Sequence, residues 1–472
     1  MRIIISILLA LLTLPIAARE KKTQEKQPLP KEVRYRLTLT VKKGTPYSIK
    51  RPEEFLSAKS IERRKRLGLD IDEHDLPIVP SYLDAIRAAG AKVFNYSKWN
   101  NTVQVSLSDS TDGTLARLRA LPYVKEALLV YVAPDSADAK DVSQRLTTVT
   151  NELKHRESAD SLYGFAQHQT DMLNLPSLHQ QGFRGEGMTI AVLDGGFYNV
   201  DGITAFDHSK ILGTRNFTRP DSNVYEEHSH GMMVLSCIAP NVPGSIVGTA
   251  PAASFYLLQS EDTWFEYRGE EDNWCAALEY ADSLGVDVVT SSLGYYYFDT
   301  PAVKMEYHWL NGQHELNSRS ASLAASRGIL LCNSAGNEGD GTWKKIGFPA
   351  DATDIITVGA VSADGTNTYF SSLGYTADGR IKPDCMAMGG RSCVLSTTGS
   401  ISTNNGTSFA CPIMAGAVTC LLQAFPKCKP TDIIEAIHHA GNYYERPNEV
   451  FGYGIPDMMK AYEYLQTTSK SK

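Results

Sequence analysis

Cysteine is absent from the first 236 residues of this 472-residue chain, and the eight cysteines that follow show no paired CxxC spacing. The first absence excludes disulfides from the N-terminal half of the chain, and the second argues against a structural zinc site. Most of the cysteines lie in apolar runs such as residues 329–332, where we expect buried free thiols. Their spacing alone selects no disulfide pairing.

The chain also lacks an excess of positive charge. Its 46 Lys and Arg residues against 53 Asp and Glu residues give a net charge of −7, which argues against nucleic acid as the main partner. The charge is unevenly distributed, because residues 1–150 hold 25 basic and 17 acidic residues, or +8, and the remainder carries −15. We therefore expect the two parts of the chain to attract each other.

Only the N-terminus has a hydrophobic run that suggests targeting. Met1 and Arg2 precede an apolar stretch, residues 3–14, and the small residues Ala17 and Ala18 follow it. This pattern predicts a signal peptide over residues 1–18, since the run is short for a membrane anchor, which needs about 20 apolar residues. We expect an exported protein, either secreted or held in the periplasm or at the cell surface, with no membrane span after signal removal.

The length and the 42% hydrophobic content predict two folded domains. Residues 33–133 combine strand-like and helix-like patterns into a small α+β unit of the split βαβ, ferredoxin-like kind. Within it, the basic cluster at residues 63–66 is interpreted as a solvated helix face. Residues 134–161 are polar and are predicted to form an exposed linker. The predicted strands are residues 33–41, 92–96, 102–107 and 124–132, and the predicted helices are residues 52–67, 82–89 and 113–120.

Residues 162–466 are predicted to form the larger domain. Five runs in it are hydrophobic throughout rather than alternating, which is typical of parallel strands buried on both faces. We therefore expect an α/β domain with a mainly parallel sheet. The runs are residues 188–193, 254–258, 286–290, 329–333 and 355–361.

Three short motifs in this domain place reactive side chains at a strand end or a helix start. Asp194 ends an apolar strand before two glycines, His230 precedes a glycine at a helix start, and Ser408 begins an apolar helix. Each has an ordinary structural alternative: a turn-capping Asp, a packed His and an N-capping Ser. A metal site at His228 and His230 is disfavoured, because no third ligand is nearby at helical spacing.

The order Asp194, His230, Ser408 is that of subtilisin, and the chain resembles the subtilases, the subtilisin-like serine peptidases, over about residues 163–465. The Gly-x-Ser-x-Gly elbow of α/β-hydrolases is absent, because Ala410 occupies the second glycine position; this and the triad order disfavour a lipase or esterase. The other motifs that carry the resemblance are at residues 248–251, 292–294, 335–339, 370–372, 382–384 and 406–412.

The resemblance implies a three-layer fold and a serine endopeptidase made as a zymogen. Ser408 would attack the scissile carbonyl, His230 would transfer the proton, and Asp194 would orient the His230 ring. Asn337 would donate to the oxyanion, and the segment Ser292, Leu293 and Gly294 would bind extended substrate. Residues 33–133 would be the prodomain, an intramolecular inhibitor.

The resemblance further implies protein or peptide substrates and no cofactor for the chemistry. Structural calcium is common in the family, but its ligands cannot be placed from this sequence. Gly195, Met232 and Met233 depart from the family pattern. The departures leave one alternative from another class, a catalytically silent binding protein with the subtilase fold.

Overall fold

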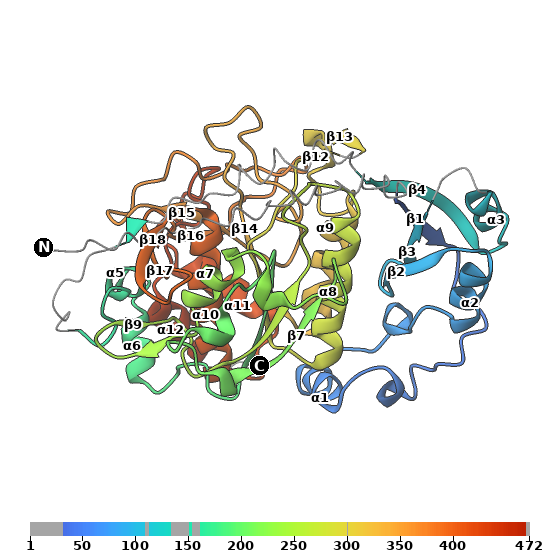
Figure 1. Ribbon diagram of the computed structural model, residues 1–472. Helices are drawn as coiled ribbons and strands as arrows, with labels where there is room; N and C mark the ends of the chain where they lie inside the picture. The colour runs from blue at the N-terminus through green and yellow to red at the C-terminus, as the bar shows by residue number, and fades with distance from the viewer. Residues whose placement is uncertain (1–31, 109–112, 134–150, 153–160, 300, 469–472) are drawn as a thin grey trace, which may run out of the picture.

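The computed structural model describes residues 32–108, 113–133, 151–152, 161–299 and 301–468 (Figure 1). The predicted signal peptide and most of the predicted linker lie outside the described residues. Two folded parts are arranged side by side, the N-terminal unit at the right of the view and the larger α/β domain at the left.

The N-terminal unit is an antiparallel sheet with helices, in the strand order β2-β3-β1-β4. In β1, Tyr35 and Leu37 face a core shared with α2 and α3, whereas Arg34 and Arg36 alternate with them and face the larger domain. The prediction of a small α+β unit is confirmed. The elements are β1 (Val33–Leu39), η1 (Pro52–Glu54), α1 (Ala58–Leu67), η2 (Glu73–Asp75), α2 (Pro80–Ala88), β2 (Lys92–Ser97), β3 (Thr102–Leu107), α3 (Thr114–Arg119) and β4 (Val124–Val132).

The larger domain is built on a seven-stranded sheet of order β16-β15-β14-β11-β6-β10-β7, in which every neighbouring pair is parallel. The prediction of an α/β domain with a parallel sheet is therefore confirmed. The five predicted strands form its centre, and the two edge strands β7 and β16 complete it. The strands are β6 (Thr189–Asp194), β7 (Ile211–Asn216), β10 (Ser254–Gln259), β11 (Val288–Ser291), β14 (Leu330–Ser334), β15 (Ile356–Val361) and β16 (Cys385–Met388).

Helices cover both faces of this sheet, which is why its strands are apolar throughout. In β6, Ile190 and Val192 pack in the core that contains α10, whereas Ala191 and Leu193 pack in the core that contains α8. The helices of the domain are α5 (Gln167–Asp171), α6 (Leu175–Gln180), α7 (His230–Ser236), α8 (Glu270–Leu284), α9 (Leu316–Ala324), α10 (Thr407–Ala424), α11 (Pro430–Ala440) and α12 (Met458–Thr468).

Three small sheets and several single turns of 3-10 helix lie outside the main sheet. The small sheets are β8 (Asn241–Val242) with β9 (Ile246–Val247), β12 (Tyr297–Asp299) with β13 (Ala302–Lys304), and β17 (Ser392–Leu395) with β18 (Ile401–Asn404) and β5 (Asn151–Glu152). The turns are η3 (Val200–Gly202), η4 (His208–Lys210), η5 (Val224–Glu226), η6 (Tyr307–Trp309) and η7 (Ala325–Arg327). One piece of the predicted linker, β5, is thus part of the larger domain.

The two parts meet at α8, which lies beside the sheet of the N-terminal unit (Figure 1). Arg36 forms ion pairs with Asp272 at 2.7 Å and with Glu271 at 3.0 Å, and all three side chains are buried. At the next turns of α8, the Glu279 carboxylate accepts hydrogen bonds from the backbone N–H groups of Lys98, at 2.7 Å, and Trp99. The opposite charges of the two parts therefore meet in specific contacts.

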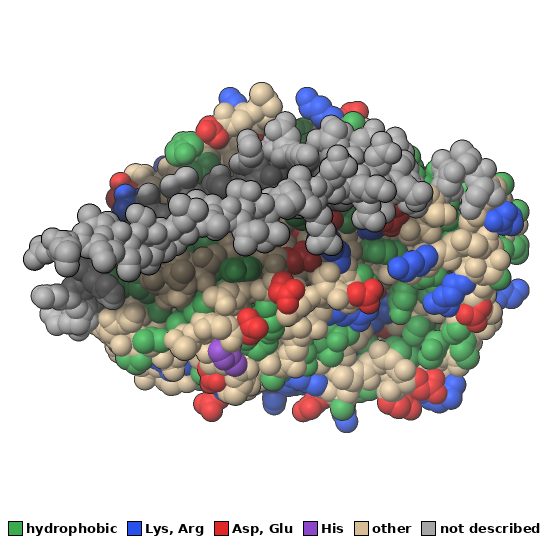
Figure 2. All heavy atoms as spheres, viewed as in Figure 1, with side chains coloured by type: hydrophobic (Ala, Val, Ile, Leu, Met, Phe, Trp, Pro, Cys, Tyr) green, Lys and Arg blue, Asp and Glu red, His purple; other side chains and the backbone are tan. Residues whose placement is uncertain are grey.

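The interpretation of residues 63–66 as a solvated helix face was wrong for two of the four residues. Arg63 and Arg64 are each 1% exposed. Both donate to the buried Asp282 carboxylate of α8, at 2.6 Å and 3.1 Å. The sequence shows a basic helix face. Its acidic partner, Asp282, is more than 200 residues away in the sequence, so the local pattern could not show that Arg63 and Arg64 are buried. On the face drawn in Figure 2, other Lys and Arg side chains gather on the outside of this end of the molecule.

All eight cysteines are buried, as predicted for most of them. Within the described residues, one helix is long and apolar enough to cross a membrane, α10, but 89% of that helix is buried in the core. This finding differs from the expectation that no stretch after the N-terminal run would be long and apolar enough to cross a membrane. The apolar character of α10 is explained by its place against the sheet.

Candidate active site

Three elements bring the predicted reactive residues to the carboxyl edge of the parallel sheet. Asp194 is the last residue of β6, His230 begins α7, and Ser408 is the second residue of α10. Ligands of open α/β sheets bind outside the carboxyl ends of the strands, so this edge is the expected place for a site. Gly406, with φ +150°, turns the chain sharply from β18 into α10.

Asp194 and His230 form a direct pair. Nδ1 of His230 lies 2.8 Å from Oδ1 and 3.0 Å from Oδ2 of Asp194, and Oδ1 also accepts from the Gly195 N–H at 2.7 Å. The Asp194 side chain is fully buried, whereas 25% of the His230 side chain is exposed. Since a carboxylate only accepts, Nδ1 of His230 carries the proton and Nε2 is free to act as a base.

The environment of His230 changes its acidity in two opposing ways. Burial disfavours the charged ring, but the charge of Asp194 and the hydrogen bond to it outweigh burial and raise the pKa of His230 above its ordinary value. The pair therefore stabilises an imidazolium, which is the state a general base reaches during proton transfer.

Ser408 lies at the N-terminus of α10 and is 7% exposed. Its hydroxyl donates to the Ser292 carbonyl at 3.5 Å, and the Ser292 hydroxyl donates to the Ser408 carbonyl at 2.8 Å. The ring of Phe409, the next residue, has its centroid 5.9 Å from that of His230. Among the described residues, Ser408 makes no hydrogen bond to His230, so the structure brings together Asp194 with His230 and Ser408 with Ser292.

Asn337 is exposed and is held by Thr407, the residue before Ser408. Its Oδ1 atom accepts from the Thr407 N–H at 2.9 Å and from the Thr407 hydroxyl at 3.0 Å. With Oδ1 occupied in this way, the two N–H groups of the Asn337 amide point away from Thr407. The first N–H groups of a helix have no partner inside the helix, so the Ser408 N–H is a second donor at this place.

The segment Ser292, Leu293 and Gly294 leaves β11 beside Ser408. The Leu293 carbonyl accepts from Nδ2 of Asn333 at 3.1 Å. The backbone groups of Gly294 make no hydrogen bond within the part of the chain that the structure describes, and a Cβ added there would meet only the Phe348 carbonyl, at 3.7 Å. Gly294 thus offers an open backbone edge to an extended peptide.

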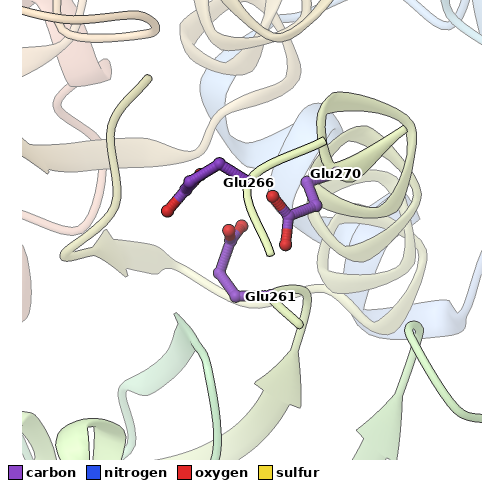
Figure 3. Close-up of side chains that lie close together, drawn as sticks. All are labelled: Glu261, Glu266 and Glu270. Atoms are coloured by element: carbon purple, nitrogen blue, oxygen red, sulfur yellow. The ribbon is translucent and has the colours of Figure 1, made fainter. Parts of the chain in front are cut away.

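Three carboxylates converge near this site, and they are the one group in the described residues with the ligand set of a metal (Figure 3). Glu261 follows β10, Glu270 begins α8, and Glu266 lies in the loop between them. Glu261 accepts from the Tyr295 hydroxyl, and Glu270 accepts from the backbone N–H groups of Asp262 and Tyr267.

Burial raises the pKa of all three carboxyl groups, that of Glu266 to about 7. Carboxyl groups packed together in the interior show such a rise whenever no cation lies among them. The rise therefore fits shared protons and a bound Ca²⁺ ion alike, and we assign no calcium ligands to the cluster.

The departures from the family pattern lie in the packing around the site. Met232 and Met233 are 0% and 2% exposed and pack in the core of α10. A Cβ at Gly195 would lie 2.7 Å from Cγ2 of Thr263, which accounts for glycine there. None of the three residues takes the place of a reactive group.

Sequence reasoning missed two contacts at this site, that of Thr407 with Asn337 and that of His228, whose Nδ1 accepts from the His230 N–H at 3.2 Å. Thr407 stands in the Gly-Thr-Ser motif, which pointed only to Ser408, although its contact with Asn337 connects two motifs 70 residues apart. His228 was considered only as a metal ligand. Its position two residues before His230, at the start of a predicted helix, was the signal that could have suggested this contact.

Comparisons with known proteins agree with this geometry. Residues 185–454 match the subtilase family, and residues 34–147 match the peptidase S8 propeptide domain of Bacteroidota. Subtilisin NAT of Bacillus subtilis subsp. natto is 26% identical over 363 residues, covering 76% of this chain and 80% of that protein. Subtilisin of Bacillus pumilus is 28% identical over 284 residues, covering 60% of this chain and 91% of its own length.

An alkaline protease of Shouchella clausii is 26% identical over 301 residues, covering 63% of this chain and 70% of that protein. The family match covers more than half of the chain and includes the carboxyl edge of the sheet. The propeptide match covers the small α+β unit. The chain therefore belongs to the subtilase family, and it is a serine-type endopeptidase with a propeptide domain.

Proposed function

We propose that this chain is an exported zymogen whose mature form hydrolyses peptide bonds with Ser408, His230 and Asp194. The observation that carries the proposal is the direct pair of Asp194 and His230, with a fully buried carboxylate and a partly exposed ring. A buried carboxylate that fixes the His tautomer is what a serine nucleophile needs in its base.

The mechanism follows from these positions. Rotation of the Ser408 side chain away from the Ser292 carbonyl brings its hydroxyl toward Nε2 of His230, which takes the proton as the oxygen attacks the carbonyl carbon of the substrate. Asp194 stabilises the imidazolium that results. His230 then gives its proton to the leaving amine, and a water molecule hydrolyses the acyl-enzyme by the same steps.

The developing oxyanion would be held by the Asn337 amide and the Ser408 N–H, at the positive end of α10. Thr407 fixes the orientation of Asn337 before substrate arrives. An extended substrate would pair with the backbone of residues 292–294, where Gly294 supplies open donor and acceptor groups. Main-chain recognition of this kind suits peptide and protein substrates of varied sequence.

Replacement of Ser408 by Ala tests the nucleophile. We expect Ser408→Ala to lose hydrolysis of a peptide substrate and to lose labelling by a fluorophosphonate reagent, while its thermal unfolding stays near that of the wild type. Retained turnover in Ser408→Ala would refute the assignment. A wild-type protein that neither cleaves peptides nor reacts with the reagent would favour the silent binding protein.

Export is the part of the proposal that rests on residues 1–18, which lie outside the described residues. Deletion of residues 2–18 should retain the protein inside the producing cells, as measured by immunoblot of cell and external fractions. Equal amounts outside the cells with and without these residues would contradict the signal peptide.

A further inference from the structure

His228 lies in the loop between η5 and α7, two residues before His230. Its Nδ1 atom accepts a hydrogen bond from the backbone N–H of His230 at 3.2 Å. The two rings are nearly parallel, with an interplanar angle of 29° and centroids 6.3 Å apart. Ser229, at the N-cap position of α7, makes no capping hydrogen bond with its side chain. His228 therefore supplies the side-chain acceptor that a helix start requires.

The backbone of His228 is fixed against the turn that follows Asp194. Its carbonyl accepts from the Tyr198 N–H at 3.1 Å, and the Gly231 N–H donates to the Gly196 carbonyl at 3.0 Å. Gly196 has φ +147°, and a Cβ there would lie 2.6 Å from the backbone nitrogen of His228. The segment that carries His228 and His230 thus touches the turn that carries Asp194, and small shifts in it would change the separation of the pair.

The charged and titratable groups that face the His228 ring come from two elements. His230 lies on the same segment, and Asp194 ends β6. The neighbouring Glu227 carboxylate is engaged by Gln259, at 2.6 Å, and lies 3.7 Å from the Arg219 guanidinium. Burial and the nearby His230 lower the pKa of His228, and Asp194 opposes them only in part. His228 is therefore neutral where the enzyme is expected to work.

We propose that His228 is a positioning residue, whose unprotonated Nδ1 holds the backbone of His230 and so keeps the His230 ring aligned with Asp194. The inference rests on the proposed function, in which His230 is the general base. Protonation of His228 would remove the acceptor and place a second positive charge beside the His230 imidazolium. Both effects would lower activity further in the pH range below the pKa of His230, where His230 is already protonated.

The tautomer of His228 is the first test, because it does not depend on activity. We expect ring ¹⁵N spectra of full-length Ser408→Ala protein labelled at histidine, which does not cleave itself, to show an unprotonated Nδ1 and a protonated Nε2 at His228 at pH 8. Assignment uses the spectrum of His228→Asn, from which one set of ring signals is missing. A proton on Nδ1 of His228 would overturn the proposal and leave the triad assignment untouched.

The kinetic test compares two variants of His228. His228→Asn keeps a short side-chain acceptor without a titrating ring, and we expect its kcat to stay within about twofold of the wild type. His228→Leu removes the acceptor, and we expect its kcat to fall about tenfold with little change in KM. Equal kcat values for the two variants, high or low, would overturn the proposal, since the acceptor would then make no difference.

The pH profile of kcat/KM shows whether His228 positions His230 or only fills space beside it. In the wild type, log(kcat/KM) should fall with a slope of one below the pKa of His230, and the slope should approach two where His228 also takes a proton. In His228→Asn the slope should stay at one. A wild-type slope of one down to the pH of unfolding, or an unchanged slope in His228→Asn, would contradict the proposed role.

Discussion

In the proposed mechanism Asn337 is the oxyanion donor, and its contact with Thr407 would orient it before the transition state forms. Its carbonyl oxygen is occupied by Thr407, so the amide nitrogen is the group left to meet a developing negative charge. The resemblance predicted Asn337 as the oxyanion donor from the Ala-Gly-Asn motif. The contact with Thr407 could not be predicted, because it joins two loops whose approach depends on the packing of α10 against β14 and β15.

We expect Asn337→Ala to lower kcat by about 100-fold or more, because an oxyanion donor acts only in the transition state. KM should change little. Steady-state hydrolysis of a chromogenic peptide measures both constants, and Asp340→Ala, at an exposed position of the same loop, is a control for general disturbance of this loop. A loss that appears mainly in KM would assign Asn337 to substrate binding instead.

The pH dependence of activity should report the pair of Asp194 and His230. A base must be neutral to accept a proton, so kcat/KM should rise with pH as His230 loses its proton. The midpoint should lie above about 6.5, the ordinary value for histidine, because Asp194 raises the pKa of His230.

Asp194→Asn removes the charge, so burial alone would act on the ring and the midpoint should move to lower pH by about one unit or more, with a much lower plateau. The measurement is a profile of kcat/KM from pH 5 to pH 9, in the wild type and the variant, at each pH where both stay folded. A wild-type maximum at strongly acidic pH would argue against a serine mechanism altogether.

At the level of elements, the strands were predictable where both faces are buried, and less so at the edges. The central strands β6, β11 and β14 are continuous apolar runs. The edge strand β7 has only one buried residue, Asn216, and shows no such run. Burial on two faces leaves a clear pattern in the sequence. The other edge strand, β16, is buried at all four positions and was still not predicted, so exposure accounts only for β7.

Helix α1 shows the opposite case. Its basic pattern was visible in the sequence, but its acidic partner in the larger domain was not. Arg63 makes its side-chain hydrogen bonds to the larger domain, including the Asp282 carboxylate and the Arg327 carbonyl at 3.1 Å. Arg66, one turn away, is 35% exposed and lies 3.6 Å from Asp287. Two arginines of one helix therefore provide a buried contact and a surface contact with the same domain.

Arg63→Met should weaken binding of the prodomain to the mature enzyme by about 100-fold, because it leaves a buried carboxylate and three carbonyl groups short of a donor. Arg66→Met should weaken binding less than about fivefold, as expected for an exposed ion pair. The inhibition constants of separately produced residues 33–133, with either change, give the comparison. Equal constants for the two variants would show that the buried contact does not determine affinity.

At the scale of the whole molecule, β5 joins one piece of the predicted linker to β18, the strand that precedes Ser408. Asn151 pairs with Thr403 and Glu152 with Ser402, in the antiparallel direction. Since β18 runs toward Ser408, the amino-terminal end of β5 points back toward Ser408.

The pairing of β5 with β18, close in sequence to Ser408, suits maturation by the chain's own active site. We expect the wild type to convert to a shorter species that begins after residue 133, and the direction of β5 favours a first cut that lies amino-terminal to Asn151. Ser408→Ala, produced without other proteases, should stay full-length apart from the signal peptide, because it lacks the nucleophile. N-terminal sequencing and intact mass of both proteins give the measurement.

Inhibition should persist after that cut, because the contacts of Arg36 and Arg63 with α8 do not depend on the covalent link. Activity should therefore appear only when residues 33–133 are degraded or diluted away, and adding them back should inhibit again. Conversion of Ser408→Ala at the normal rate would assign the cut to another protease. Full activity with residues 33–133 still attached would show that this domain is not an inhibitor, whatever its role in folding.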